Sequence, residues 1–286
     1  MSSPARLRVG IIGVGKVGSV VGAALQSAGH PVVGVTAISE ISRHRAAQYF
    51  PATDIVSMDQ ILELCDLVVV AIPDDHLESV IAGLAKTSGF RSGQIVVHLS
   101  GRHGLTVLEP AAAHGALVAA AHPAMTFAGT THDLARLEGC PWAVTAVGDA
   151  LLIAQALVLE MGGRPTVIDD ELRIRYHAAL SHASNHLVTL VHEVHETLRD
   201  IGIDDVHYAE SLMTATLENA MVMHVDALTG PISRGDVATV AAHINAIRES
   251  HDLPSYRALA QSTISAALRA RKISEETAQE LRDIVA

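Results

Sequence analysis

The chain has 286 residues, of which 49% are hydrophobic and 18% charged, so it can form two domains with sizeable apolar cores and is not disordered. Its formal net charge of −11, with no basic stripe, argues against a nucleic-acid partner. No apolar run resembles a membrane span, and the N-terminal segment enters the first predicted strand at once, which leaves no room for a signal peptide. Cys65 and Cys140 show no metal or redox spacing. We therefore expect a cytoplasmic protein with no membrane or nucleic-acid partner.

The first predicted element is a buried parallel strand over Leu7–Ile12, followed by a glycine-rich turn and a small-residue apolar helix over Val20–Ala28. In the pattern G-x-G-x-x-G, the first glycine permits a tight turn, the second lets backbone approach a pyrophosphate, and the third lets the helix pack closely on the strand. The helix N-terminus adds free N–H groups and a partial positive charge. We predict a dinucleotide site, with a ligand-free glycine turn as the alternative, at Gly13, Val14, Gly15, Lys16, Val17 and Gly18.

The second predicted strand, Pro31–Thr36, is followed by hydroxyl and guanidinium side chains, which suit the 2′-phosphate of NADP(H). Glu40 is the exception, because it could hold a ribose or lie in the first turn of the next helix. We predict NADP(H), with its 2′-phosphate near Ser39, Ser42 and Arg43. The alternative is that Arg43 and Arg45 lie on a solvated helix face.

Further strands complete an α/β domain, and the strands are expected at Thr53–Val56, Asp66–Ile72, Gln94–Leu99, Ala116–Ala121, Trp142–Thr145 and Pro165–Ile168. Open α/β sheets bind ligands at the carboxyl edge. We therefore predict that Ile72 and Pro73 contact the cofactor, and that Asp74 and Asp75 cap the helix that follows.

From Asp169 onwards the strand signal ends and long helical periods follow, over Asp169–Asp200, Asp204–Leu228, Asp236–Glu249, Pro254–Arg271 and Ser274–Val285. The predicted fold class is α/β, with a Rossmann-type doubly wound parallel sheet over residues 1–168 and an all-α domain over residues 169–286. A substrate cleft is expected between these two domains.

Three groups of residues are candidates for catalysis in that cleft. Ser100 precedes Gly101 at a strand end beside the expected nicotinamide, where the glycine would let a substrate approach, and His122 ends the next strand. His177, Ser181 and Asn185 lie at positions i, i+4 and i+8 of the long helix and so share one face. Such a stripe would normally be apolar, so these polar groups point to a cofactor and a carbonyl substrate, or to an interdomain hydrogen-bond network. A satisfied polar residue is the alternative reading for His122.

Arg234 lies between Gly230 and Gly235 and is a candidate for a bidentate grip on a carboxylate, although this segment could be only a turn that joins two helices. Asp236 is expected to cap the next helix. The 17 histidines do not form a metal motif, because the segment His192–Glu196 has its histidines three residues apart rather than in HExxH spacing. We predict no metal.

The chain resembles the Rossmann-like proteins that carry a DUF2520 helical domain. The matching segments are GIIGVGKVGS, VVVAIPDDHL, HLSG at 98–101, HPAMTFAG at 122–129, YHAALSHASNHLVTL at 176–190 and LTGPISRGD at 228–236. The resemblance implies membership of a wider group of two-domain NADP oxidoreductases that includes ketopantoate reductase, pyrroline-5-carboxylate reductase and prephenate dehydrogenase. It also implies a homodimer formed through the helical domain.

Ketopantoate reductases have the helix pattern Lys-x-x-x-Asn-x-x-x-Asn, and this chain has His177, Ser181 and Asn185 at that spacing. The resemblance implies NADPH-dependent reduction of a small 2-oxo acid, most specifically ketopantoate. His177 would be the general acid, Ser181 and Asn185 would hold the oxygen, and Arg234 or Ser100 would bind the carboxylate. The alternatives are an imine or pyrroline-carboxylate reductase, a prephenate-type dehydrogenase, or a non-enzymatic NADP-binding sensor.

Overall fold

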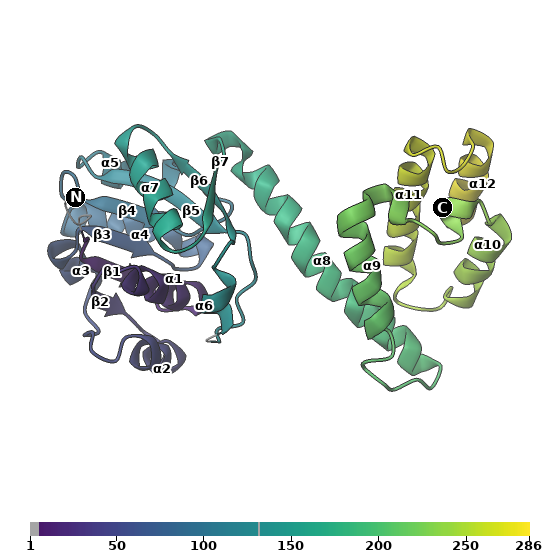
Figure 1. Cartoon of the computed structure of the whole chain (residues 1–286), viewed down its shortest axis with the longest axis horizontal. Helices are drawn as coiled ribbons and strands as arrows, with labels where there is room; N and C mark the ends of the chain where they lie inside the picture. Colours follow the sequence, from purple (N-terminus) through teal and green to yellow (C-terminus); the bar gives the residue numbers. More distant parts are fainter. Residues whose placement is uncertain (1–5, 131) are drawn as a thin grey trace. The chain divides into compact units, whose positions relative to one another are not determined.

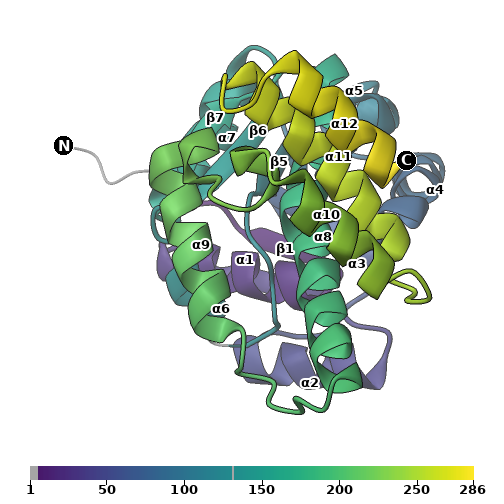
Figure 2. The ribbon, with the colours of Figure 1, turned by 90° about the vertical axis from the view of Figure 1, so that its right-hand side faces the viewer.

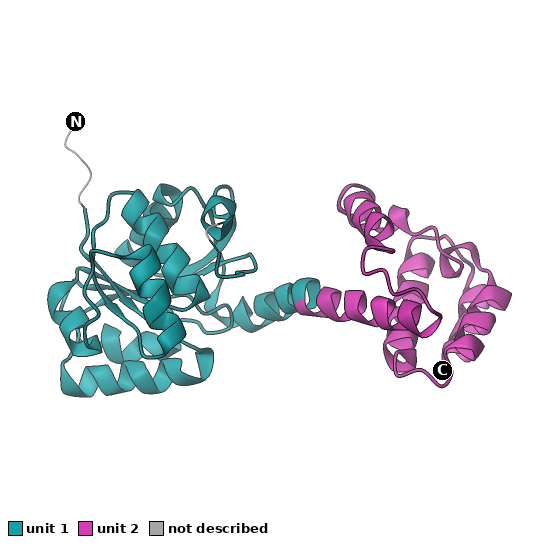
Figure 3. Cartoon of the chain, turned by 90° about the horizontal axis from the view of Figure 1, so that it is seen from below, with its two compact units in different colours: residues 1–184 teal, residues 185–286 magenta. Residues whose placement is uncertain are grey.

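The computed structural model describes residues 6–130 and 132–286 (Figure 1). The chain divides into two compact units, residues 1–184 and 185–286 (Figure 3). The division falls inside helix α8 (Arg173–Asp200), beyond the end of the sheet at residue 167. The sheet thus ends close to the boundary predicted at 168/169, and the division between compact units lies further along the chain.

Unit 1 contains one seven-stranded sheet with the order β2-β1-β3-β4-β5-β6-β7. Neighbouring strands are parallel except β5 and β6, which are antiparallel. The chain passes from β1 outwards to β2 and then back across β1 to β3, so the carboxyl ends of β1 and β3 lie at a topological switch point, where such sheets bind ligands. The strands are β1 (Val9–Ile12), β2 (Val32–Thr36), β3 (Leu67–Val70), β4 (Ile95–His98), β5 (Leu117–Pro123), β6 (Pro141–Ala146) and β7 (Arg164–Val167).

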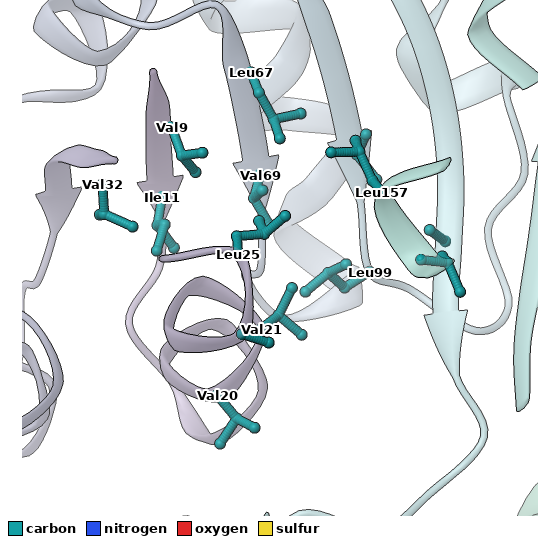
Figure 4. Packing of buried hydrophobic residues seen from close by; sticks show 14 of the residues in the cluster. Val9, Ile11, Val20, Val21, Leu25, Val32, Leu67, Val69, Leu99 and Leu157 are labelled. Carbon is teal, nitrogen blue, oxygen red and sulfur yellow. The ribbon is translucent and has the colours of Figure 1, made fainter. Parts of the chain in front are cut away.

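Helices cover both faces of this sheet because alternate strand residues supply two separate cores. On one face, Val9 and Ile11 of β1 pack with Leu67 and Val69 of β3 against α1 (Figure 4). On the other face, the intervening strand residues pack against α3, α4 and α5. The predicted doubly wound architecture is confirmed. The helices of unit 1 are α1 (Lys16–Ser27), α2 (Glu40–Tyr49), α3 (Met58–Leu64), α4 (Asp74–Thr87), η1 (Thr106–Leu108), α5 (Glu109–Ala112), α6 (His132–Arg136), α7 (Asp149–Glu160), η2 (Asp170–Leu172) and the first part of α8.

The strand predicted at Thr53–Val56 is wrong. Only Ile55 pairs with β2, through an isolated bridge to Val35, and the Ile55 side chain is half exposed. A strand needs more than one pairing residue and a buried face, and this short segment has neither. Both cysteines are free and buried, and burial raises the pKa of the Cys65 thiol to about 11 and also raises that of Cys140.

Unit 2 contains the second part of α8 followed by α9 (Glu210–Met223), η3 (His224–Ala227), η4 (Ile232–Arg234), α10 (Val237–Ala246), α11 (Leu253–Arg269) and α12 (Glu275–Val285). Helices α10, α11 and α12 lie side by side (Figures 1 and 2) and bury a small core around Val240, Ile264 and Leu281. Asp236 caps α10 as expected, because its carboxylate accepts a hydrogen bond from the Thr239 N–H at 3.0 Å. No residue of α9 is buried.

No helix in the described part of the chain is both long and apolar enough to span a membrane.

Candidate functional site

The three glycines of the first turn have different surroundings. Gly13 has φ +98°, and a Cβ atom there would lie 2.5 Å from the carbonyl oxygen of Ala71. A Cβ on Gly18 would lie 2.1 Å from the carbonyl oxygen of Gly13. Around Gly15, by contrast, the described residues place no atom within 4 Å of a Cβ. Gly13 and Gly18 therefore shape the turn, whereas Gly15 leaves open space beside the start of α1.

The end of β2 holds the glycine turn in place. The Thr36 hydroxyl accepts a hydrogen bond from the Gly13 N–H at 2.9 Å, and the Thr36 carbonyl accepts one from the Val14 N–H at 3.2 Å. The side chains of Val14 and Val17 pack into the core, so these two residues can offer only backbone groups to a ligand.

Positive charge gathers at the N-terminus of α1. Lys16 is the first helical residue, and the first turn contains no acidic side chain. A Cβ on Gly129, which has φ +86°, would lie 3.1 Å from Cγ of Lys16 and 3.4 Å from Nη2 of Arg45. Lys16 and Arg45 therefore meet at the loop that follows β5. Since the helix dipole is already positive here, the lysine adds charge that an anion would compensate.

The residues predicted for the 2′-phosphate lie at the start of α2. Ser39 is its N-cap and accepts a hydrogen bond from the Ser42 N–H at 3.1 Å, while the Ser42 hydroxyl donates to the Ser39 carbonyl at 2.8 Å. Arg43 is exposed on the helix. Arg45, rather than Arg43, lines a pocket of about 470 Å³ with Glu40, Ile41, His44, Gln48 and Gly129.

Ile72 and Pro73 lie between β3 and α4, next to the glycine turn. Cγ2 of Ile72 would be 3.0 Å from a Cβ on Gly13. The prediction that Asp74 and Asp75 cap α4 is wrong, because Pro73 occupies the N-cap position and the aspartates begin the helix. Their negative charges interact favourably there with the positive end of the helix dipole. Carboxylate oxygens of Asp74 and Asp75 also lie 3.6 and 3.7 Å from guanidinium nitrogens of Arg102.

Residues from β4, β5 and α8 meet at the carboxyl edge of the sheet. A Cβ on Gly101 would lie 2.6 Å from Cδ2 of His177 and 3.0 Å from Nε2 of His122. The two imidazole rings are edge to face, with centroids 6.2 Å apart. We call Ser100, Gly101, His122, Tyr176 and His177 the strand-end cluster. Its glycine makes room for the two histidine rings.

Tyr176 is a member of this cluster that sequence reasoning missed. Its hydroxyl lies 2.9 Å from Nδ1 of His122, and the two rings are edge to face with centroids 5.7 Å apart. Burial, followed by the charges of Arg173 and His177, lowers the pKa of His122 to about 4. Burial raises the pKa of Tyr176 to about 12. Both side chains are therefore neutral at pH 7.

Arg173 holds the Ser100 end of the strand-end cluster in place, and sequence reasoning did not identify it either. Its side chain is fully buried, and it donates hydrogen bonds to the Ser100 carbonyl at 2.6 Å and to the Thr145 hydroxyl at 3.0 Å. The Ser100 hydroxyl accepts a hydrogen bond from the His103 N–H at 3.1 Å, which leaves its own proton available to donate. A buried charge of this kind fixes the loop at Ser100, because breaking its hydrogen bonds would leave the guanidinium unpaired.

The other predicted catalytic residues are divided between the two units. Ser181 is half-buried one helical turn after His177, within unit 1. Asn185 is exposed and begins unit 2. Arg234 also belongs to unit 2, where its guanidinium donates to the Thr229 carbonyl.

Sequence profiles identify two domains in this chain. Residues 2–123 match the Rossmann-like domain, and residues 140–263 match DUF2520, a domain of unknown function. No curated protein sequence matches the chain.

Solved structures share the fold over nearly the whole chain. A provisionally named NADP oxidoreductase from Bacteroides fragilis has a TM-score of 0.77 at 20% identity, covering 90% of this chain and 98% of its own. The 1-pyrroline-5-carboxylate reductase of Streptococcus pyogenes has a TM-score of 0.61 at 16% identity, covering 97% and 99%. The reductive aminase of Aspergillus terreus, solved with NADPH and ethyl levulinate, has a TM-score of 0.60 at 15% identity, covering 98% and 93%.

Proposed function

Because the chain belongs to the proteins that join a Rossmann-like domain to a DUF2520 domain, we propose that it is an NADPH-dependent oxidoreductase of a small carbonyl or imine compound. The observation that carries this proposal is the open space at Gly15, next to a helix N-terminus with Lys16 and Arg45 beside it. Backbone N–H groups and fixed positive charge at such a point suit the phosphates of a dinucleotide. The similar structures named above include an NADP oxidoreductase and an enzyme bound to NADPH.

The residues present fit this cofactor. Backbone groups of the glycine turn would hold the pyrophosphate, and Lys16 would compensate its charge. Arg45 would contact the 2′-phosphate in place of Arg43, because Arg45 lines the pocket on α2 and approaches Lys16 at Gly129. Ile72 and Pro73, at the end of β3, would border the cofactor. When bound, NADPH supplies the hydride.

The strand-end cluster supplies the groups that act on a substrate. The Ser100 hydroxyl has a proton to donate to a carboxylate or carbonyl oxygen. His177 is half-buried beside Gly101 and is the candidate proton donor. Ser181 is one turn further along the same helix, where it would help to hold the substrate oxygen. The roles suggested by family resemblance for Asn185 and Arg234, in holding the oxygen and the carboxylate, belong to this proposal too.

Two substrate classes follow from these considerations. Resemblance to ketopantoate reductases favours a 2-oxo acid, ketopantoate in particular. Similarity to the pyrroline-carboxylate reductase and the reductive aminase favours a C=N substrate instead. The test is a panel of 2-oxo acids, ketopantoate included, and cyclic imines, with NADPH oxidation followed by absorbance. Turnover with either class supports the proposal and identifies the class.

Two other outcomes of this test would contradict the proposed activity. NADPH that binds tightly but is never oxidised would indicate a sensor, whereas a protein that does not bind NADPH would contradict the dinucleotide site as well. The binding titration therefore accompanies the substrate panel.

We further propose that the chain forms a homodimer through its helical unit. On α9, the side chains of Leu212, Leu217, Met221 and Val222 are 52–80% exposed. A 14-residue helix is only marginally stable alone in water, so a helix with no buried residue needs a partner surface. Unit 2 also has an apolar groove of about 640 Å³, lined by residues of α8, α10 and α11.

Sedimentation equilibrium tests the dimer. The double substitution Leu212→Glu with Val222→Glu should give a monomer, because it places two charges on the apolar surface of α9. Asn245→Glu, at an exposed polar position of α10, is the matched control and should leave the dimer intact. A wild-type monomer at micromolar concentration would contradict this part of the proposal.

A further inference from the structure

His122 and Tyr176 form a hydrogen-bonded pair inside unit 1. The Tyr176 hydroxyl and Nδ1 of His122 are 2.9 Å apart, and both side chains are half-buried. This contact occupies one ring nitrogen of His122. The other nitrogen, Nε2, is on the opposite side of the ring and lies 3.0 Å from where a Cβ on Gly101 would stand.

The protonation of Tyr176 bears on which partner donates in this hydrogen bond. With a pKa of about 12, the Tyr176 hydroxyl keeps its proton at neutral pH. It can therefore donate that proton to Nδ1 of His122, 2.9 Å away. A neutral imidazole that accepts at Nδ1 must carry its hydrogen on Nε2.

Burial keeps the His122 ring neutral, and the surrounding charges add to this effect. Burial lowers the pKa of the ring most strongly, Arg173 and His177 lower it further, and Asp74 acts in the opposite direction. A ring held neutral in this way cannot be the source of the proton. It can still donate a hydrogen bond through Nε2–H, and such a donor stabilises negative charge that develops on a substrate oxygen.

His98, on the neighbouring strand, has the same tautomer, with its hydrogen on Nε2, and both of its ring nitrogens bond to backbone groups. Its Nδ1 accepts a hydrogen bond from the Ser100 N–H at 3.2 Å, and its Nε2 lies 2.9 Å from the Gly104 carbonyl, which can only accept. Both ends of that ring are thus bonded within the protein. For His122, Nδ1 contacts the Tyr176 hydroxyl, whereas the Nε2 edge of the ring lies beside Gly101.

We infer that Tyr176 is a positioning residue that fixes His122 in the Nε2–H tautomer, and that His122 donates this hydrogen bond to the substrate's carbonyl oxygen. The inference rests on the proposed reductase function. It gives the two histidines different roles, since His122 stabilises the substrate oxygen and His177 supplies the proton. Gly101 is part of the arrangement, because a side chain there would displace the Nε2 edge of the ring.

The first test reads the tautomer directly, by ¹⁵N NMR of the histidine ring nitrogens in the full-length protein without substrate. Wild-type His122 should be neutral between pH 5.5 and 8, with its hydrogen on Nε2. Tyr176→Phe keeps the ring but removes the hydroxyl, and the signal should change to a mixture of the two tautomers. Tyr256→Phe is the matched control, because the Tyr256 hydroxyl makes a 2.9 Å contact with Nδ1 of His243 in unit 2. It should change the His243 signal and leave that of His122 unchanged.

The second test measures activity. Tyr176→Phe should lower kcat about tenfold and leave the KM for NADPH unchanged, because only the orientation of one donor is lost. His122→Gln places an amide N–H near the position of Nε2 and should retain more activity than His122→Asn. In the His122→Gln background, Tyr176→Phe should have little further effect, since no tautomer remains to be fixed.

The two tests fail in different ways. Wild-type His122 with its hydrogen on Nδ1, or an unchanged tautomer in a folded Tyr176→Phe variant, would overturn the inference even if the enzyme is active. A full tenfold loss from Tyr176→Phe in the His122→Gln background would also overturn it. Because the NMR measurement needs no substrate, the absence of any turnover would overturn the proposed function and the donor role of His122, and would leave the tautomer result intact.

Discussion

Replacing each glycine of the first turn by alanine separates folding from cofactor binding. Gly15→Ala adds a methyl group that meets no protein atom within 4 Å among the described residues, and the backbone φ of −81° suits alanine. Alanine is a poorer N-cap than glycine by less than about 1 kcal/mol, so the free energy of unfolding should hardly change. The methyl group would, however, occupy the space beside the helix N-terminus that a pyrophosphate needs. Losing one charge-assisted hydrogen bond there costs about 1.5–3 kcal/mol, which raises the Kd for NADPH roughly 10- to 100-fold.

Gly13→Ala and Gly18→Ala should behave in the opposite way. Alanine at φ +98° costs about 1–2 kcal/mol in backbone strain, and overlap with the Ala71 carbonyl adds about 1–3 kcal/mol. At Gly18 the overlap is with the Gly13 carbonyl, which outweighs the roughly 0.5–1 kcal/mol that alanine gains inside a helix. Both variants should therefore unfold more easily than wild type.

Two measurements check this set. Denaturant unfolding is followed by the fluorescence of Trp142, the single tryptophan of the chain, which is buried in unit 1 and so reports on that unit. NADPH binding is measured by calorimetric titration. If Gly15→Ala bound NADPH as tightly as wild type, the open space at Gly15 would not be a cofactor site and the reasoning would be refuted.

Three further predictions concern other parts of unit 1. Gly101→Ala should lower kcat on the order of 10²-fold without weakening NADPH binding, because the added Cβ displaces the His177 and His122 rings, and an unchanged kcat would contradict this. His98 and His122 accept a proton near pH 6.5 when unfolded but only near pH 4 when folded, so the free energy of unfolding should fall by roughly 3 kcal/mol per histidine as the pH drops from about 6.5 to 4. Urea titrations across this range check the fall, and a stability independent of pH would argue against it. Arg45→Ala should raise the Kd for NADPH about tenfold and leave the Kd for NADH unchanged, whereas Arg43→Ala should change neither. Titration of both variants with both cofactors checks this, and a larger effect of Arg43→Ala on NADPH binding would contradict it.

Local patterns in the sequence predicted much of the fold because they depend on near neighbours. The glycine spacing and the buried strand before it place the turn correctly, since φ and close packing are properties of a few residues. Asp236 was identified as a helix cap for the same reason. Ser100 and His122 were predicted at neighbouring strand ends and His177 on the helix after the sheet, and in the structure both histidine rings lie beside Gly101.

The missed residues depend on contacts between distant parts of the chain. Tyr176 is about 100° around the helix from His177 and so lies outside the polar stripe at positions i, i+4 and i+8, yet its hydroxyl contacts His122 on β5. From its residue type alone, Arg173 would be expected on the surface, because buried arginines are rare. It is buried because its guanidinium donates hydrogen bonds to the Ser100 carbonyl and the Thr145 hydroxyl. These partners are far from Arg173 in the sequence, so no local pattern predicts them.

The compact units also divide later than the loss of strand signal indicates. Sequence periodicity detects where strands stop, but Arg173, Tyr176 and His177 attach the first turns of α8 to the sheet. These turns therefore belong to unit 1, although they are helical like the residues that follow.

The two buried cysteines make the chain a convenient background for chemical labelling. A thiol reacts as its thiolate, and Cys65 and Cys140 are buried and have raised pKa values, so maleimide reagents should leave both unmodified at pH 7. A cysteine introduced at Leu217, on the exposed surface of α9, would then carry a spin label or fluorophore alone. Its labelling rate at increasing protein concentration would report how fully that helix is covered, without removing any native residue elsewhere.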